Sequence, residues 1–149
     1  MDFQELKLKQ YASLIEDEKD EIAILSNTSA FLYEILEDVN WVGFYFVKGD
    51  ELVLGPFQGK TACYRIPFSR GVCGWVARNE KPIIVPNVHE FEGHIACDAS
   101  SNSEIVLPIF KDGKLYAVLD IDSAEFDNFC ILEQVFLGEI IEILEKKWK

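Results

Sequence analysis

Hydrophobic residues recur at three- and four-residue intervals near both ends of the chain. This spacing runs through residues 20–39 and again through residues 127–149, and each run predicts an amphipathic helix. Asp127 or Asn128 is expected to cap the start of the last helix, because both side chains accept hydrogen bonds from free backbone N–H groups. A shorter run at 6–15 predicts one more helix before these two.

The middle of the chain alternates apolar and polar residues, which is the pattern of β-strands. Two pairs of such runs flank Gly49-Asp50 and Asp112-Gly113, and each pair predicts a hairpin. Shorter strands are expected at 61–66 and 83–85, and a short helix is expected to follow Arg70 and to end near Pro82. Helices at both ends of an antiparallel sheet predict an α+β fold in a single domain that spans residues 1–149.

The segment 86–103 shows neither the spacing of a helix nor the alternation of a strand. It is longer than most structureless loops in compact domains. It carries His89, His94 and Cys97 and ends next to Glu104. Long loops of this kind are usually lids, binding loops or disordered linkers, and a linker inside a sheet would be unusual. We therefore interpret the segment as a functional loop, with both histidines exposed to solvent.

Acidic residues dominate the charge, with 26 Asp and Glu against 14 Lys and Arg and a net charge of −12. Such a surface repels nucleic-acid phosphates and anionic lipid, so neither nucleic acid nor a membrane is an expected partner. The sequence shows no signal peptide and no apolar run of transmembrane length, so we expect a cytoplasmic protein. Thiols are normally reduced in the cytoplasm, so the four cysteines are not expected to form a permanent disulfide framework.

Acidic residues also gather on one face of the predicted strand 115–122. Strand alternation divides this run into one face with Tyr116, Val118, Asp120 and Asp122 and an opposite face with Leu115, Ala117, Leu119 and Ile121. Glu104 starts the preceding strand of the hairpin, so it is expected near both aspartates. One interpretation is that this face is exposed to solvent at the end of the sheet. The other is that the crowded carboxyl groups bind a cation and that one of them keeps a proton for acid catalysis.

The cysteines differ in their surroundings. Cys97 lies among polar residues, whereas free structural cysteines are usually buried among apolar ones. Cys73 is expected near a helix start, a position that lowers the pKa of a thiol, and Cys63 is expected in a short strand. Cys130 has apolar neighbours on the last helix and is interpreted as core packing.

A zinc site is the competing interpretation for Cys63, Cys73, Cys97 and His94. Structural zinc sites usually take two ligands from one closely spaced pair of cysteines, and these cysteines are widely separated in the sequence. We therefore expect no metal.

Trp41 and Tyr45 lie on one face of the predicted strand 41–48. The opposite face carries Val42, Phe44 and Phe46, so the strand is expected to be covered on both sides. The two rings either pack in the core or form an aromatic wall for the apolar or sulfur-bearing end of a small ligand.

The most distinctive motifs are "NWVGFYF", "GPFQGKTACYRIPFSRGVCGWVA", "PNVHEFEGHIACDASSNSEIVLPIF" and "AVLDIDS". Together they resemble the free methionine-(R)-sulfoxide reductases, which are enzymes built on a single GAF domain, and the resemblance covers nearly the whole chain. It implies a central antiparallel sheet with the N- and C-terminal helices packed on one side and a long active-site loop on the other.

The resemblance also implies a role for each motif residue. Cys97 matches the catalytic cysteine, Cys63 the principal resolving cysteine, and Cys73 a third cysteine that forms or relays a disulfide. The substrate-binding residues of the family are matched by Glu104, Asp120 and Asp122 and by the aromatic pair Trp41 and Tyr45. Cys130 has no counterpart in these motifs.

The implied reaction is the thiol-dependent reduction of free L-methionine (R)-S-oxide to L-methionine. Cys97 becomes a sulfenic acid, Cys63 condenses with it to an intramolecular disulfide, and a thioredoxin-type reductant driven by NADPH resets the pair. Glu104, assisted by Asp122, is the expected proton donor, and no cofactor is needed. The alternative is a non-catalytic GAF module that senses a small ligand or redox state. The apolar N-terminal helix makes a homodimer a further expectation.

Overall fold

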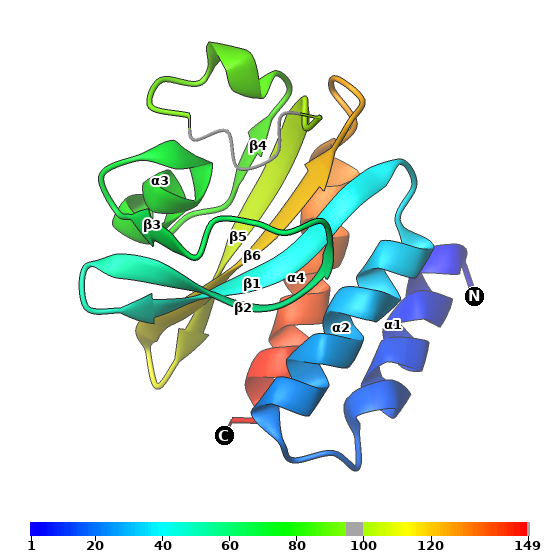
Figure 1. Ribbon diagram of the computed structural model, residues 1–149. Coiled ribbons are helices and arrows are strands. Elements are labelled where there is room, and N and C mark those ends of the chain that lie inside the picture. Colours follow the sequence, from blue (N-terminus) through cyan, green and yellow to red (C-terminus); the bar gives the residue numbers. More distant parts are fainter. Residues whose placement is uncertain (95–99, 149) are drawn as a thin grey trace.

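A six-stranded antiparallel sheet forms the centre of the computed structural model, which describes residues 1–94 and 100–148. Its strands are β1 (Val39–Lys48), β2 (Glu51–Gly59), β3 (Arg65–Pro67), β4 (Ile83–Val85), β5 (Ser103–Lys111) and β6 (Lys114–Ser123). They lie side by side in the order β3-β2-β1-β6-β5-β4 (Figure 1). The segment 95–99, which includes Cys97, lies outside the described residues.

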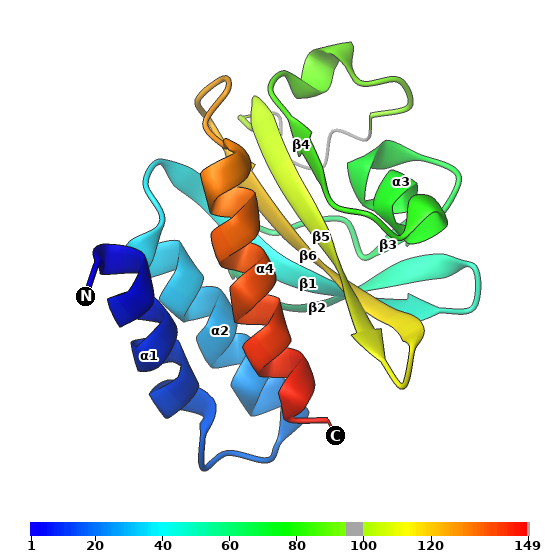
Figure 2. The same ribbon diagram turned by 180° about the vertical axis from the view of Figure 1, so that it is seen from behind.

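Three helices cover one face of the sheet, and a shorter helix lies on the other face (Figures 1 and 2). The first face carries α1 (Phe3–Ile15), α2 (Glu21–Ile35) and α4 (Ile131–Lys146). The second face carries α3 (Gly71–Asn79), and the segment with the 3₁₀ turn η1 (Val88–Glu90) continues that side. This arrangement confirms the predicted α+β fold with the terminal helices on one side of the sheet.

The strands in the middle of the sheet have two apolar faces because each face has its own cover. On β1, Val42 and Phe44 pack in the core beneath the three long helices. Trp41 and Tyr45, which alternate with them, pack in a second cluster beneath α3. The face assignment predicted for this strand is confirmed, and it places the aromatic pair on the α3 side.

Both predicted hairpins are present, and their turns use the backbone freedom of the residues at their tips. Gly49 has φ 68° between β1 and β2, and Asp112 and Gly113 have φ 55° and 77° between β5 and β6. Left-handed φ values at both central residues match a type I′ turn, whose twist suits a two-residue hairpin. The hairpin β5–β6 fixes which residues of these two strands face each other.

Strand β6 departs from strict alternation near its start. The pairing between β5 and β6 shifts between Ile109 and Phe110, so Phe110 pairs with Leu115 whereas Ile109 pairs with Ala117. Beyond this bulge Leu115 packs on the α3 side and Tyr116 on the helix side, which is the reverse of the prediction for these two residues. From Ala117 to Ile121 the apolar side chains lie on the predicted face.

The predicted cap of the last helix is wrong. Cys130 is the N-cap of α4, and its thiol and backbone N–H both donate to the Glu133 carboxylate, at 3.0 and 3.3 Å. Asp127 has a left-handed φ of 52°, and the Asn128 side chain donates to the Glu37 carbonyl instead. Cys130 is therefore exposed at a helix start, which corrects its interpretation as core packing.

Within residues 1–94 and 100–148, no helix is both long enough and apolar enough to cross a lipid bilayer. Helix α1 leaves Phe3, Leu6 and Leu14 exposed. The homodimer expected from this helix stays a prediction.

Candidate active site

A cavity opens on the α3 side of the sheet, between the strands and the segments that cover them. Its volume is about 50 Å³, and we call it the acidic cavity. Among the described residues it is lined by Trp41, Tyr45, Thr61, Ala62, Ile66, Gly71, Val72, Cys73, His94, Ser101, Glu104, Asp120 and Asp122. Six of the residues singled out from the sequence are thus brought together here: two aromatic, three acidic and Cys73.

The strand register explains how the three carboxyl groups meet. Glu104 of β5 lies opposite Asp122 of β6, and Val106 lies opposite Asp120. Glu104 and Asp120 therefore point to the same face, two positions apart along the ladder. Their exposed fractions are only 7% and 6%. The interpretation that these carboxyl groups are simply exposed to solvent at the end of the sheet is therefore wrong. Their predicted proximity is confirmed.

Burial decides the protonation of this cluster. It raises the pKa of Glu104 well above its ordinary value, and the neighbouring charges of Asp120 and Asp122 raise that pKa further. Burial also raises the pKa of Asp120, although hydrogen bonds with Glu104 and Cys73 oppose the shift. Crowded carboxyl groups resist ionising together in a low dielectric, so burial and crowding both favour the protonated form of Glu104.

The thiol of Cys73 belongs to the same cluster. Cys73 lies in the first turn of α3 with an exposed fraction of 3%. Burial raises its pKa well above the ordinary value, and Asp120 and Glu104 raise it further. The helix start was expected to lower this pKa, but desolvation and three acidic neighbours outweigh the effect of the helix dipole.

A single metal ion could bridge part of the cluster. The Cys73 sulfur and a carboxylate oxygen from each of Glu104 and Asp120 lie within 4.8 Å of one another. A thiol and two carboxyl groups would have to lose their protons to act as ligands, and burial favours their protonated forms. The absence of a metal stays our expectation for this site.

The aromatic wall depends on two glycines. The Trp41 indole stacks against Tyr45 and against Phe57, with ring centroids 5.9 and 5.3 Å away, and it donates to the Lys60 carbonyl at 3.0 Å. A Cβ atom on Gly43 would lie 2.5 Å from the indole, and one on Gly59 would lie 2.6 Å from it. Both glycines therefore leave the space that the indole occupies, and Trp41 serves both as core and as cavity wall.

Replacing Gly43 with alanine is expected to destabilise the fold by about 1–3 kcal/mol, because the new methyl group overlaps the indole and the Phe57 side chain. Chemical denaturation measures this change. Gly138→Ala is the matched control, because a Cβ atom there meets nothing within 4 Å and alanine favours a helix. Equal stabilities for the two variants would contradict the tight packing described here.

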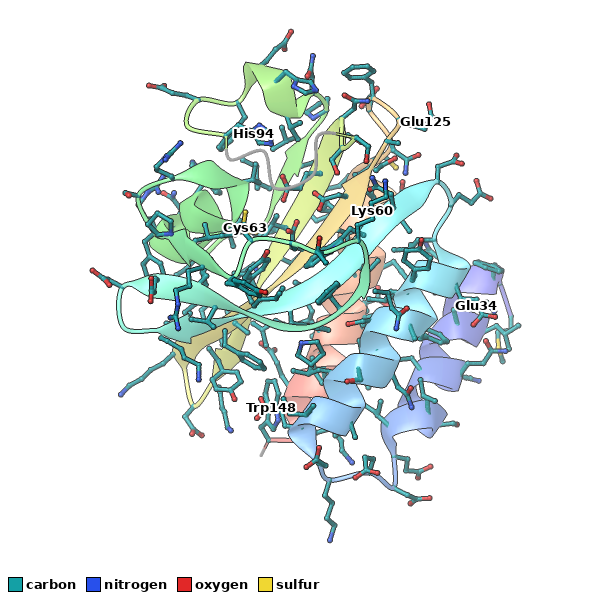
Figure 3. All side chains as sticks on the ribbon, in the orientation of Figure 1. Glu34, Lys60, Cys63, His94, Glu125 and Trp148 are labelled. Carbon is teal, nitrogen blue, oxygen red and sulfur yellow. The ribbon has the colours of Figure 1, made fainter. Side chains whose placement is uncertain are left out.

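Cys63 lies beside the cavity rather than in its lining. It is half-buried in the segment between β2 and β3, and its carbonyl accepts a hydrogen bond of 3.0 Å from the Tyr45 hydroxyl. Figure 3 shows Cys63 on the α3 side of the sheet. The strand predicted at 61–66 is shorter and lies later in the chain, since β3 spans only Arg65–Pro67. Cys97, the predicted nucleophile, lies outside the described residues.

The described parts of the loop 86–103 are held by specific hydrogen bonds. The Val88 amide donates to the Asn102 carbonyl at 2.9 Å, and the His89 ring bonds the Asn102 side chain at 2.8 Å. The Asn102 side-chain amide in turn donates to the Ala124 carbonyl at 2.7 Å, beyond the end of β6. His89 is exposed as predicted, but His94 is half-buried and lines the acidic cavity, so the prediction for His94 is wrong.

Sequence patterns missed the polar half of this cavity. His94 and Ser101 come from the loop 86–103, which has no periodicity to orient their side chains, and Thr61 was predicted in a strand that begins only at Arg65. The glycines at 71 and 93 are the sequence feature that could have indicated this contact, because glycine adopts left-handed backbone conformations most readily. In the structure their φ values are 74° and 81°, and the Gly71 N–H donates to the Gly93 carbonyl at 2.8 Å. This contact brings the loop against the start of α3.

The chain is similar to proteins of known family over most of its length. The sequence profile of the GAF domain matches residues 18–145. The free methionine-R-sulfoxide reductase of Escherichia coli (strain K12) is 52% identical over 139 residues, which cover 93% of this chain and 84% of the relative. The structure of the protein fRMsr of Staphylococcus aureus in complex with substrate is 51% identical, with a TM-score of 0.93 and coverage of 99% and 96%.

The free methionine-R-sulfoxide reductase from Neisseria meningitidis, also solved in complex with its substrate, is 45% identical. Its TM-score is 0.92, with 99% of this chain and 91% of the other covered. Fold, identity and coverage agree over almost the entire length. The chain belongs to the GAF domain family, and within it to the family of the free methionine-R-sulfoxide reductases.

Proposed function

We propose that this protein reduces free L-methionine (R)-S-oxide to L-methionine. The observation that carries the proposal is the acidic cavity itself, where a buried carboxyl cluster that retains a proton lies beside an aromatic wall. The named activity of its relatives in E. coli and N. meningitidis supports the same substrate. A cavity of this size suits a small molecule that displaces a few waters, whereas a folded protein substrate could not enter it.

The charges of the cavity favour a free amino acid. One carboxylate oxygen of Asp120, Oδ1, is buried and has no hydrogen-bond partner among the described residues. We propose that it accepts the substrate ammonium group, with Asp122 alongside. A methionine within a peptide has no such charge and would leave this oxygen unpaired at a cost in binding. The methylthio end would then lie against Trp41 and Tyr45, since sulfur packs well on aromatic rings.

The chemistry we propose begins at Cys97. Its thiolate bonds to the electrophilic sulfur of the sulfoxide, and the S–O bond breaks as the oxygen leaves as water, with one proton from Glu104, assisted by Asp122, and a second proton from solvent. A water molecule then attacks the Cys97 sulfur, breaks the new sulfur–sulfur bond and returns one proton. Methionine leaves with the two electrons that Cys97 has lost, and Cys97 is left as a sulfenic acid. Without a nearby acid the oxygen would have to depart as a poor, charged leaving group.

Recycling then requires two further thiol steps. We propose that the Cys63 thiol condenses with the sulfenic acid, releasing water and forming a disulfide. A dithiol protein of the thioredoxin type, kept reduced by NADPH, returns both cysteines to thiols by exchange. Cys73 either takes part in a second disulfide or relays one. The scheme needs neither a metal nor an organic cofactor.

The direct test is an NADPH-coupled assay with thioredoxin and thioredoxin reductase. We expect NADPH consumption with the (R) epimer of free methionine sulfoxide and little or none with the (S) epimer or with a peptide that contains the sulfoxide. The same assay without the protein gives the background. No turnover of the (R) epimer, even with dithiothreitol in place of thioredoxin, would contradict the proposal and favour a GAF module that only senses ligands.

Cys63→Ser is expected to release about one methionine per chain in a single turnover but to lose steady-state turnover with thioredoxin, because the sulfenic acid lacks its partner. Rapid quench with methionine quantification measures the first phase, and NADPH consumption measures the second. Cys130→Ser is the matched control, since that exposed thiol only caps α4 and serine is a good cap. Unchanged steady-state turnover in Cys63→Ser would assign resolution to Cys73.

A further inference from the structure

The proposed recycling step requires an accessible surface around Cys63. A protein that reduces a disulfide must bring one of its own sulfur atoms into contact with the sulfur that it attacks. The acidic cavity, at about 50 Å³, is too small to admit a folded protein. Cys63 lies beside that cavity and is half-buried, so a protein reductant has to reach it from outside, across the residues that flank it.

We infer that the reductant docks on the exposed segment around Cys63, and that it is a dithiol protein with an apolar and negatively charged surface around its reactive thiol. This inference rests on the proposed function and specifies the contact surface of the partner. We call this surface the docking face and define it by four exposed side chains: Lys60, Tyr64, Arg65 and Arg70. Figure 3 labels Lys60 and Cys63 on this segment, which lies on the α3 side of the sheet.

Tyr64, the residue next to Cys63, supplies the apolar part of the docking face. Its exposed fraction of 79% is the highest among the large apolar side chains that the structure describes. Its backbone carbonyl accepts a hydrogen bond of 2.9 Å from the Leu54 N–H, so the main chain is anchored to β2 while the ring is exposed. An exposed aromatic ring is ordinary by itself, but tyrosine is enriched where protein interfaces bind most strongly. A ring beside the resolving thiol is covered whenever a protein contacts that thiol.

Charge is the second feature of the docking face. Residues 52–79 form the longest run of the sequence without Asp or Glu, in a chain of net charge −12. The run contains four cationic residues: Lys60, Arg65, Arg70 and Arg78. Arg65 pairs with Glu51 at 2.8 Å, whereas Lys60 and Arg70 make no salt bridge with any described residue. The docking face is thus locally positive on an acidic protein, which favours a partner with negative charge near its thiol.

The edge of the sheet gives the docking face a backbone contact as well. β3 is the outermost strand on its side of the sheet, with β2 as its neighbour. Arg65 pairs with Val53 of β2 and begins β3 two residues after Cys63. The outer side of an edge strand leaves backbone N–H and C=O groups for a partner. A reductant that binds here contacts both side chains and backbone next to the thiol.

The exchange at this surface involves only the sulfur atoms of the two proteins. One thiolate of the partner bonds to the Cys63 sulfur, the proposed Cys63–Cys97 bond breaks, and Cys97 leaves as a thiolate. The second thiolate of the partner then bonds to the partner's first sulfur and releases Cys63 as a thiolate. The partner loses two electrons and becomes a disulfide, the two cysteines gain these electrons, and the two thiol protons of the partner neutralise the released thiolates.

The test compares reduction by a protein with reduction by a small dithiol. Wild type, Tyr64→Ala and Lys60→Glu are assayed with saturating free methionine sulfoxide. The varied reductant is a thioredoxin of net negative charge in one series and dithiothreitol in the other. Dithiothreitol is small enough to react without covering the docking face. Tyr33→Ala on α2 and Lys9→Glu on α1 are the matched controls, because both residues are exposed on helices that cover the opposite side of the sheet.

We expect the KM for thioredoxin to rise by about fivefold or more in Tyr64→Ala and by about threefold or more in Lys60→Glu at low salt. The effect of Lys60→Glu should shrink as salt is added, because salt screens exposed charges. Rates with dithiothreitol should stay within about twofold of wild type, since a small reductant makes few of these contacts. Both controls should behave as wild type with either reductant.

An unchanged KM in Tyr64→Ala, or an equal loss with dithiothreitol, would overturn the docking face. An unchanged KM in Lys60→Glu would overturn the negative charge assigned to the partner. Turnover of wild type with dithiothreitol but not with thioredoxin would overturn the inference and leave the reduction of methionine sulfoxide standing. No turnover of wild type with either reductant would instead reject the proposed function.

Discussion

Glu104→Gln is expected to lower the rate of methionine release in a single turnover by a factor of about 10²–10⁴, which is the usual contribution of a positioned acid. Glutamine keeps the shape of the side chain and its hydrogen bonding, but its amide cannot supply a proton to the departing oxygen. The carboxyl group of Glu104 is buried next to Asp120 and Asp122 and lines the acidic cavity, so the substitution removes this acid from the site of reaction. Rapid-quench measurement of methionine tests this expectation.

Glu139→Gln is the matched control for this prediction. It makes the same chemical change on the exposed face of α4, on the opposite side of the sheet from the cavity. Its rate should equal that of wild type. A Glu104→Gln rate within a few-fold of wild type would contradict the role of Glu104 as proton donor and would transfer that role to Asp122 or Asp120.

The same substitution should stabilise the folded protein, and more so at higher pH. A carboxyl group whose pKa is raised by folding keeps its proton in the folded state after the unfolded chain has lost it, so stability falls as pH rises through that window. Below the ordinary pKa of 4.5 both states are protonated and Glu104 contributes no penalty. The gain in the melting temperature of Glu104→Gln should therefore be larger at pH 8 than at pH 4.

Cys97→Ser is the second substitution with a large expected effect. It should abolish methionine release even in a single turnover, because a serine hydroxyl is a weak nucleophile toward sulfur and cannot form a sulfenic acid. Quenched reactions analysed for methionine and for chain mass measure the two products together. Wild type should gain one oxygen or form a disulfide, whereas the variant should remain unmodified.

Cys130→Ser again provides the matched thiol control, with methionine release as in wild type. Methionine release by Cys97→Ser at a rate near that of wild type would contradict the proposed nucleophile. Cys63 or Cys73 would then have to attack the substrate, although burial raises the pKa of Cys73 and so disfavours its thiolate, which is the nucleophilic form.

Much of the fold could be predicted because its signals are local. Helical periodicity, two short turn motifs and strand alternation placed α2, α4 and both hairpins, and alternation assigned the two faces of β1. The hairpin β5–β6 also brought Glu104 near the two aspartates, as predicted. Its exact partner depends on the bulge, because the register of Lys111 with Lys114 would by itself place Glu104 opposite Ile121, whereas the shift between Ile109 and Phe110 places it opposite Asp122.

The rest depends on contacts that no local pattern encodes. The bulge that exchanges Leu115 and Tyr116 arises from pairing with β5. The pKa of Cys73 is raised first by burial and then by three acids of β5 and β6, and together these outweigh the helix start from which a lowered pKa was predicted. Cys130 and His94 were assigned from their neighbours in sequence, yet one is exposed at a helix cap and the other lines the cavity. In each case tertiary packing decides the environment of the side chain.

A ¹³C NMR titration of the side-chain carboxyl carbons reports the protonation of Glu104 directly, with its signal assigned by its absence in Glu104→Gln. We expect this carboxyl group still to carry its proton at pH 7, where surface glutamates are ionised. A Glu104 signal that titrates near pH 4.5, as an ordinary glutamate does, would contradict it, because the cluster would then have no proton to give.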